Sequence, residues 1–230
     1  MIIQSGVPRI SIEEERMTRG KRTKDKEERI LQAAVRLFGR KGYHASSIAD
    51  IADEAGVAAG TIYLYFKRKE DLLVRLFQKY IGGYVEDSRP AIRAAEPGLA
   101  RLYTLVSRQL RFFDADKTLA RAFEIHLREV NPVIRDGIRP TLRDYFVIID
   151  EVIEEGKTAG DFDPLLDVAI ARRLLFGGLE QVVTSWVLSR RNYSLVEVLD
   201  PLFTMLARAM GASSDSIKTS LDAQREPESV

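Results

Sequence analysis

The stretch that decides the fold, residues 47–69, reads SIADIADEAGVAAGTIYLYFKRK. Ser47 is a good helix N-cap, and Asp50 follows three residues later as in a capping box. Gly56 interrupts the helical pattern and can adopt the positive φ of a tight turn without strain. A second short helix, Gly60 to Phe66, follows the turn. The pattern predicts a helix–turn–helix, whose second helix can enter the major groove of DNA.

The residue types of the second helix suit contact with a nucleic acid. Gly60 and Thr61 are small and leave room for close approach to base edges, while Tyr63 and Tyr65 offer hydroxyl donors. Three cations, residues 67–69, follow at once. The alternative is an ordinary corner between two helices of a bundle, with solvated basic residues.

Outward from this motif, apolar residues recur at helical spacing along most of the chain. Further helices are predicted over residues 25–42, from 70 to 82–83 or somewhat beyond, and over 99–113, 117–129, 132–156, 164–189 and 195–210. Asn131-Pro132, Asp163-Pro164 and the capping box Ser194–Glu197 mark three helix starts. Arg89-Pro90 predicts a break, and Pro140 and Pro201 each predict a kink or break. Strand signals are missing, so we expect an all-α protein.

The chain divides into four parts by pattern. Residues 1–23 show no periodicity and predict a flexible basic arm, which either reaches the minor groove or the DNA backbone or is simply solvated. Residues 24–80 form the expected DNA-binding domain, and residues 81–211 are enough for a separate helical core. Residues 212–230 are polar and lack a period, so we expect a disordered tail.

Charge and composition exclude several function classes. The net charge is +1, but residues 1–69 hold 14 Lys and Arg against 9 Asp and Glu, and the remainder holds 21 against 25. This basic front and acidic rear fit a protein with one end at phosphates. The chain has no cysteine and two histidines, which argues against a metal site. Motifs for catalysis, membrane spans and secretion signals are missing, so we expect a soluble, cytoplasmic protein that is not an enzyme.

The run Gly60 to Phe66, followed by Lys69-Glu70-Asp71-Leu72, resembles the DNA-binding module of the TetR family of bacterial transcriptional regulators. The similar stretch extends from about Lys24 to Tyr80 and includes Leu37-Phe38, Gly42-Tyr43 and Ala55-Gly56-Val57. The resemblance implies a three-helix module whose third helix reads the major groove, carried on a homodimeric repressor that binds a palindromic operator.

The resemblance also implies roles for single residues. Ser47 and Tyr65 would contact phosphate, and Lys69 would hold a phosphate at the start of the fourth helix. The expected DNA-binding residues are Ser47, Gly60, Thr61, Tyr63, Tyr65, Lys67 and Lys69. One departure is that Ala58-Ala59 stand where many relatives have a hydroxyl residue and a lysine, which removes one possible cap and one phosphate contact.

Two apolar stripes in the last long helices predict a dimer interface. In the family that the chain resembles, the C-terminal region binds an effector and dimerises. Two amphipathic helices, doubled by symmetry, would form an isologous four-helix interface; the alternative is that the stripes belong to the internal core alone. The expected interface residues are Leu175, Val182, Val183, Trp186, Leu199, Leu202 and Leu206.

Aromatic and apolar side chains are abundant in the middle helices. Such loading is typical of a core, and also of ligand pockets between bundle helices. His126 is either a polar group that orients a ligand or an ordinary core or surface residue. The expected ligand-binding residues are Tyr103, Leu110, Phe113, Phe123, His126, Leu127, Tyr145, Ile149, Phe176 and Leu179.

Residues 60–66, 128–135 and 150–156 are similar to those of a narrower subgroup, the repressors of fatty-acid degradation that respond to long-chain acyl-CoA. The similarity implies a tunnel for an acyl chain and positive charge at its mouth for the CoA phosphates. Arginines that could supply the charge are Arg108, Arg111, Arg121, Arg128, Arg172 and Arg173. We therefore expect an acyl-CoA effector and no other cofactor. The alternatives are an efflux-type repressor that senses broad hydrophobic compounds and a ligand-free architectural DNA-binding protein.

Overall fold

The computed structural model describes residues 12–124 and 131–225, with side chains over 23–123 and 131–225. Over these residues the chain is helical and contains no strand, which confirms the predicted all-α class. The elements are α1 (Ile12–Lys41), α2 (Ile48–Ala55), α3 (Ala59–Tyr63), α4 (Lys69–Ala94), α5 (Leu99–Asp114), α6 (Lys117–Glu124), α7 (Pro132–Ala159), α8 (Val168–Leu188), the 3₁₀ turn η1 (Leu195–Val198), α9 (Leu199–Ala209) and α10 (Ser214–Arg225).

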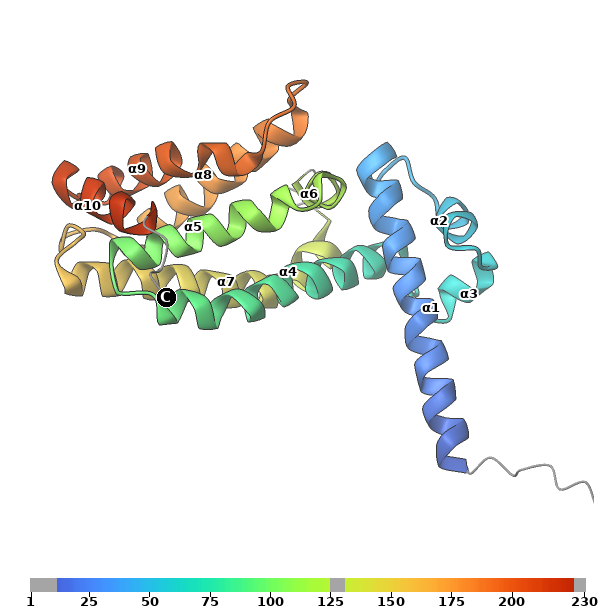
Figure 1. Ribbon diagram of the computed structural model, residues 1–230. Helices are drawn as coiled ribbons and strands as arrows, with labels where there is room; N and C mark the ends of the chain where they lie inside the picture. The colour runs from blue at the N-terminus through green and yellow to red at the C-terminus, as the bar shows by residue number, and fades with distance from the viewer. Residues whose placement is uncertain (1–11, 125–130, 226–230) are drawn as a thin grey trace, which may run out of the picture.

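Helices α1, α2 and α3 form a small module (Figure 1), and its buried residues belong to one continuous core with those of the other helices. The apolar face of α1 buries Ile30, Ala34 and Phe38, which recur about one turn apart. Ile51 from α2 and Ile62 from α3 are also fully buried. In Figure 1, α2 and α3 lie on the side of α1 that faces away from the remaining helices, so the second helix of the motif stays accessible from outside.

Helix α4 joins this module to a larger bundle, where it packs along α7 (Figure 1). The predicted break at Pro90 is wrong, because α4 continues through this proline to Ala94. One side chain on each side of the proline ties the helix to α7: Arg89 donates to the carbonyl of Asp144, and Arg93 forms a 2.8 Å ion pair with Glu151. Pro140 likewise lies inside the uninterrupted helix α7.

Most of the predicted helix starts are confirmed. Ser47 with Asp50 and Ser194 with Glu197 form the predicted capping boxes, and the Asn131 side chain accepts from the N–H of Val133. The break expected at Pro201 occurs slightly earlier, where η1 gives way to α9. Helix α8 begins at Val168 rather than at Pro164, because the Asp167 side chain caps it by accepting from the N–H of Ile170.

Both chain ends contain more helix than expected. The arm predicted over residues 1–23 is helical from Ile12, as an extension of α1. The tail predicted to be disordered contains α10, whose Ile217 is buried and whose Arg225 forms a 2.5 Å ion pair with Asp200 of α9. Helix α10 has a single buried residue, Ile217, which explains why periodicity did not reveal it. Of the helix predicted over 117–129, residues 117–124 are helical and the rest lies outside the described residues.

Candidate nucleic-acid interface and ligand cavity

The turn between α2 and α3 is fixed by contacts from both sides. Gly56 ends α2 with a φ of 63° and a ψ of 44°, the left-handed conformation that favours glycine. Arg29 of α1 donates to the carbonyls of Ala55 (2.7 Å) and Gly56 (3.2 Å). This arginine sets the position of the turn relative to α1, and the sequence offered no signal for it.

A second clamp holds α2 against α1. Glu54 accepts from Arg36 at 2.8 Å and from Arg40 at 2.5 Å. These two hydrogen bonds lower the pKa of the Glu54 carboxyl, with Arg36 the larger cause. Because Arg36 and Arg40 lie one turn apart on α1, one carboxylate fixes both helices in register.

Helix α3 presents its outer face without any covering element. Ile62 faces the core, whereas Tyr63 is 57% exposed. A Cβ built on Gly60 would meet no atom of the protein within 4 Å, so packing within the chain does not require glycine there. Of the predicted DNA-binding residues, Ser47, Gly60, Tyr63 and Lys67 are exposed, and Thr61, Tyr65 and Lys69 are half-buried.

Leu64 belongs to the same surface and was missed by sequence reasoning. It follows directly after α3 and is 82% exposed, which is unusual for a leucine next to a packed core. Its signal was visible in the periodicity, since Ile62 and Phe66 take the inward positions and leave Leu64 outside.

Lys69 has protein partners in addition to its predicted role. Its ammonium donates to the carbonyls of Tyr43 and Ser46, each at 2.9 Å, and lies 4.2 Å from the centre of the Tyr43 ring. The residue therefore ties the first turn of α4 to the loop between α1 and α2. Lys67, by contrast, makes no ion pair within the part of the chain that the structure describes, and its side chain is exposed.

A small apolar cavity lies between α4, α5, α7 and α8, and we call it the core cavity. It measures about 20 Å³, which is room for a single water molecule. Three of the predicted ligand residues line it, namely Phe113, Tyr145 and Phe176. The remaining lining residues are Phe77, Ile81, Tyr84, Gln109, Leu142 and Glu180.

The other predicted ligand residues lie elsewhere. Leu110, Phe123, Ile149 and Leu179 are buried in the general core and do not line the cavity. Tyr103 packs against Phe203 of α9 and donates to Asp200 at 3.3 Å, away from the cavity. His126 and Leu127 lie outside the described residues. Helical spacing identified the buried face but could not distinguish a cavity wall from solid packing.

Two tyrosines place polar groups in the core cavity. The Tyr145 hydroxyl donates to the side-chain oxygen of Gln109. Burial raises the pKa of Tyr84 to about 12 and the pKa of Tyr145 well above its ordinary value. Both hydroxyls therefore stay protonated at neutral pH and can act as hydrogen-bond donors.

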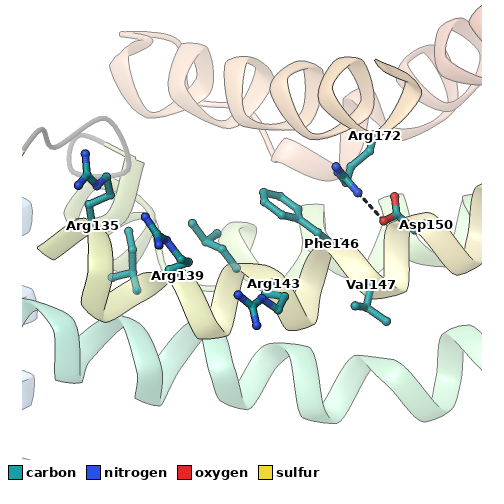
Figure 2. Close-up of a pocket in the computed structure, with 9 residues that line it drawn as sticks. Arg135, Arg139, Arg143, Phe146, Val147, Asp150 and Arg172 are labelled. Atoms are coloured by element: carbon teal, nitrogen blue, oxygen red, sulfur yellow. Dashed lines mark hydrogen bonds and ion pairs between the residues drawn. The ribbon is translucent and has the colours of Figure 1, made fainter. Parts of the chain in front are cut away.

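A larger cleft of about 470 Å³ opens along α7, and we call it the arginine cleft (Figure 2). Figure 2 shows Arg135, Arg139 and Arg143 following one another along α7, with Arg172 reaching in from α8. Arg172 is ion-paired with Asp150 and lies 5.5 Å from the centre of the Phe146 ring. Leu142 lines both this cleft and the core cavity, so one side chain separates the two.

Only one of the six arginines singled out from the sequence lines this cleft, namely Arg172. Arg108 and Arg111 line a different cleft, between α4 and α5. Arg121 donates to the carbonyl of Val187, Arg173 donates to that of Ala169, and Arg128 lies outside the described residues. The three arginines of α7 were missed, although their spacing of four residues places them on one helix face.

The predicted dimer helices present a different face from the one expected. Five of the predicted interface residues are buried within the protomer, which leaves them little surface for a partner, and Val182 and Leu202 are half-buried. The five are Leu175, Val183, Trp186, Leu199 and Leu206. The exposed apolar residues of α8 and α9 lie beside them instead. Ile170, Leu174, Leu188 and Met205 are between 51% and 72% exposed. The two stripes are core, and their neighbours are uncovered.

Among the described residues, no group of His, Asp and Glu could hold a metal ion. No helix in that part of the chain is long and apolar enough to cross a membrane.

Comparison with known proteins matches nearly the whole helical region. Residues 30–76 match the family described as bacterial regulatory proteins, tetR family, and residues 77–209 match the C-terminal region of YsiA-like proteins, a tetR-type domain. Helix α10 and the beginning of α1 lie outside both matches.

Three similar proteins are regulators of fatty-acid metabolism. The fatty acid metabolism regulator protein of Bacillus subtilis is 35% identical over 81% of this chain and 96% of its own length. The crystal structure of FadR from Bacillus subtilis in complex with stearoyl-CoA has a TM-score of 0.74 at 35% identity, covering 78% of this chain and 97% of that one. The fatty acid degradation regulator FadR from Bacillus halodurans has a TM-score of 0.76 at 37% identity, covering 82% and 97%.

Proposed function

Because the chain belongs to the tetR family of bacterial transcriptional regulators, with FadR-type regulators of fatty-acid metabolism among its relatives, we propose that it is a homodimeric repressor that binds a palindromic operator and is released by long-chain acyl-CoA. One observation carries the effector assignment. An apolar cavity meets a cleft with four arginines at a single side chain, Leu142. This is the combination that an apolar chain with a polyanionic head requires.

The reading surface is the outer face of α3 with the N-terminus of α2. Tyr63 and Leu64 protrude from it, and a leucine side chain suits contact with the methyl group of thymine. Ser47, Tyr65 and Lys67 flank this face and suit contact with phosphate. Few of these side chains can form hydrogen bonds with bases, so phosphate contacts supply much of the affinity and binding falls steeply with salt.

The dimer forms through α8 and α9. Ile170, Leu174 and Met205 form an uncovered apolar face on these helices, beside a groove of about 140 Å³. Two copies of this face, related by a twofold axis, bury these three side chains against those of the partner. The same axis places the two copies of α3 about 34–36 Å apart, which is the spacing of successive major grooves.

Effector binding requires the core cavity to open. A site for a lipid-sized ligand has roughly 300 Å³ or more, whereas this cavity has about 20 Å³. Phe77, Ile81 and Tyr84 of α4 form one wall, so an entering acyl chain displaces α4. Helices α1, α2 and α3 together form what we call the reading module. The start of α4 is connected to it through Lys69 and through the ion pair of Arg75 with Glu27 of α1 at 2.9 Å. Displacement of the wall therefore reaches α1 and α2.

Under this proposal, residues 24–80 read DNA and residues 81–211 bind the effector and dimerise, with α4 shared between the two parts. Residues 12–23 extend α1 beyond the module and can add phosphate contacts. The protein acts in the cytoplasm, where bacterial DNA lies, and it supplies no catalysis or further cofactor.

The decisive experiment measures operator release. An operator is first selected from a random duplex pool, and fluorescence anisotropy then follows binding with added stearoyl-CoA, coenzyme A or tetraphenylphosphonium, a hydrophobic cation that does not intercalate into DNA. We expect release by stearoyl-CoA alone. The variant Arg143→Gln should need at least tenfold more stearoyl-CoA, while Arg173→Gln, outside the cleft, should behave as the parent. Release by tetraphenylphosphonium and not by stearoyl-CoA would replace the effector with a broad hydrophobic class. Failure to bind any duplex would refute the function.

A further inference from the structure

A second cleft, between α4 and α5, is unrelated to the arginine cleft. It measures about 450 Å³ and shares no lining residue with the cleft along α7. We call it the α4–α5 cleft. Its lining residues are Lys79, Tyr80, Gly83, Tyr84, Asp87, Ser88, Arg108, Arg111 and Phe112.

Three buried polar atoms on this lining lack a hydrogen bond: the Tyr84 hydroxyl, the Ser88 hydroxyl and Nε of Arg108. Tyr84 is 8% exposed and Ser88 is 1% exposed. Burial raises the pKa of Tyr84 and the nearby hydroxyls of Tyr145 and Ser88 lower it in part, but neither the Tyr84 hydroxyl nor the Ser88 hydroxyl has a partner with hydrogen-bond geometry. Folded proteins rarely leave buried polar groups unpaired, because each loses its hydration without compensation.

All three groups can donate at neutral pH. A guanidinium has donors only, and burial keeps the Tyr84 hydroxyl protonated, with a pKa of about 12. Arg108 is held in place because its Nη2 donates to the carbonyl of Asp87 at 3.0 Å. The charged side chains on the lining are Lys79, Arg108 and Arg111 against Asp87, so the lining carries more positive than negative charge. Converging donors with excess positive charge match an oxyanion.

Apolar surface adjoins these donors. The rings of Tyr84 and Phe112 are 4.8 Å apart between centres, and Tyr80 lies on the same lining. Tyr84 also lines the core cavity, so it stands between that cavity and the α4–α5 cleft. A ligand here can therefore combine an anionic head with an apolar tail.

We propose that the α4–α5 cleft is an oxyanion-binding site, in which Ser88, Tyr84 and Arg108 hold a carboxylate or phosphate head while the adjoining aromatic rings accept an aliphatic tail. The site is separate from the cleft assigned to the acyl-CoA head. Lys79, on its lining, is ion-paired with Glu28 of α1, so an anion in the cleft competes with Glu28 for this ammonium. Occupancy therefore acts on the contact between α4 and the reading module.

Isothermal titration calorimetry on the full chain tests the site with sodium decanoate, 1-decanol and inorganic phosphate. We expect decanoate to bind at least tenfold more tightly than 1-decanol, which has the same chain without the charge. Binding of phosphate alone would identify a phosphate head as the ligand class and still support the site. Equal binding of decanoate and 1-decanol, or saturation by neither anion, would overturn the proposal.

Variants separate this site from the arginine cleft. Arg108→Gln and Ser88→Ala should each weaken binding of the anion at least tenfold, whereas Arg143→Gln should change it by less than twofold. Thr104→Ala on α5 is a matched hydroxyl control, because Thr104 donates to the carbonyl of Ala100 at 2.9 Å.

If Arg108→Gln does not fold, Ser88→Ala carries the test, since it removes an unpaired group and should not lower the Tm. A loss in Arg143→Gln equal to that in Arg108→Gln would refute a separate site. Operator release by stearoyl-CoA, measured on the same variants, is an independent readout of the proposed function.

Discussion

Replacing Lys69 with alanine separates a structural role from a DNA-binding role. The ammonium of Lys69 makes two 2.9 Å hydrogen bonds to carbonyls and one contact with the Tyr43 ring. A hydrogen bond from a charged donor contributes about 1.5 kcal/mol at the lower end of its range, which is appropriate here because water can reach a half-buried site. The ring contact contributes about 0.5 kcal/mol. The loss should therefore be about 3.5 kcal/mol.

For a chain of this length, such a loss lowers the Tm by about 7–14 °C. Thermal melting followed by circular dichroism measures it directly. Lys67→Ala is the matched control, because that side chain is exposed and makes no ion pair among the described residues. It should keep the parent Tm, weaken operator binding and reduce the slope of log K against log salt by about 0.9. A Tm for Lys69→Ala within 2 °C of the parent would show that the two carbonyl contacts do not anchor α4.

Three further predictions concern the fold, the dimer and pH. Gly39→Ala should destabilise the protein by about 1–3 kcal/mol in urea unfolding, because its Cβ would lie 2.7 Å from the carbonyl oxygen of Thr118 on α6. The control Gly83→Ala should not destabilise the protein, because its Cβ would meet no atom within 4 Å. Equal unfolding midpoints for the two variants would contradict the packing argument. Leu174→Glu should produce monomers in sedimentation velocity, while Val147→Glu on α7 should sediment as the parent; an unchanged dimer for Leu174→Glu would move the interface away from α8. Hydrogen bonds from Arg36 and Arg40 lower the pKa of Glu54 below its ordinary value of 4.5, so the stability they contribute is present above that pH and is lost as pH falls through the folded pKa. The Tm of the parent should thus fall more steeply below about pH 4.5 than that of Glu54→Gln, and parallel curves would exclude this cause.

The reading module was predictable because its signals are local. Ser47 with Asp50, and Gly56 at a left-handed turn, act within a few residues and were identified correctly from the sequence. The same is true of Asn131 and of Ser194 with Glu197. Arg29 and Lys69 act across 26 residues of sequence in each case, and their carbonyl partners have no side-chain signature. Such contacts can only be found once the helices are placed.

The bundle was predictable in outline and less so in detail. Pro90 predicts a break because proline removes a helical hydrogen bond, but this part of α4 is held against the bundle by buried Val85 and Ile92 together with the contacts of Arg89 and Arg93 with α7. The stripes on α8 and α9 have the correct period, yet periodicity cannot say whether a stripe faces its own core or a second copy. The arginines at positions 135, 139 and 143 were detectable from their spacing, whereas the unpaired atoms of the α4–α5 cleft were not.

The continuity of α4 has a mechanical consequence. As a single helix of 26 residues it is about 39 Å long, and Pro90 near its far end does not divide it. A rod of this length that tilts by about 5° about one end moves its other end by about 3 Å, so small angular changes at the effector end become ångström-scale shifts at the operator. Sensitivity to ligand is then governed by bending stiffness, which is lowest at the glycine pair in the middle of the rod, Gly82-Gly83, so replacing both glycines with alanine should stiffen the link between sensing and repression while leaving both ends able to bind.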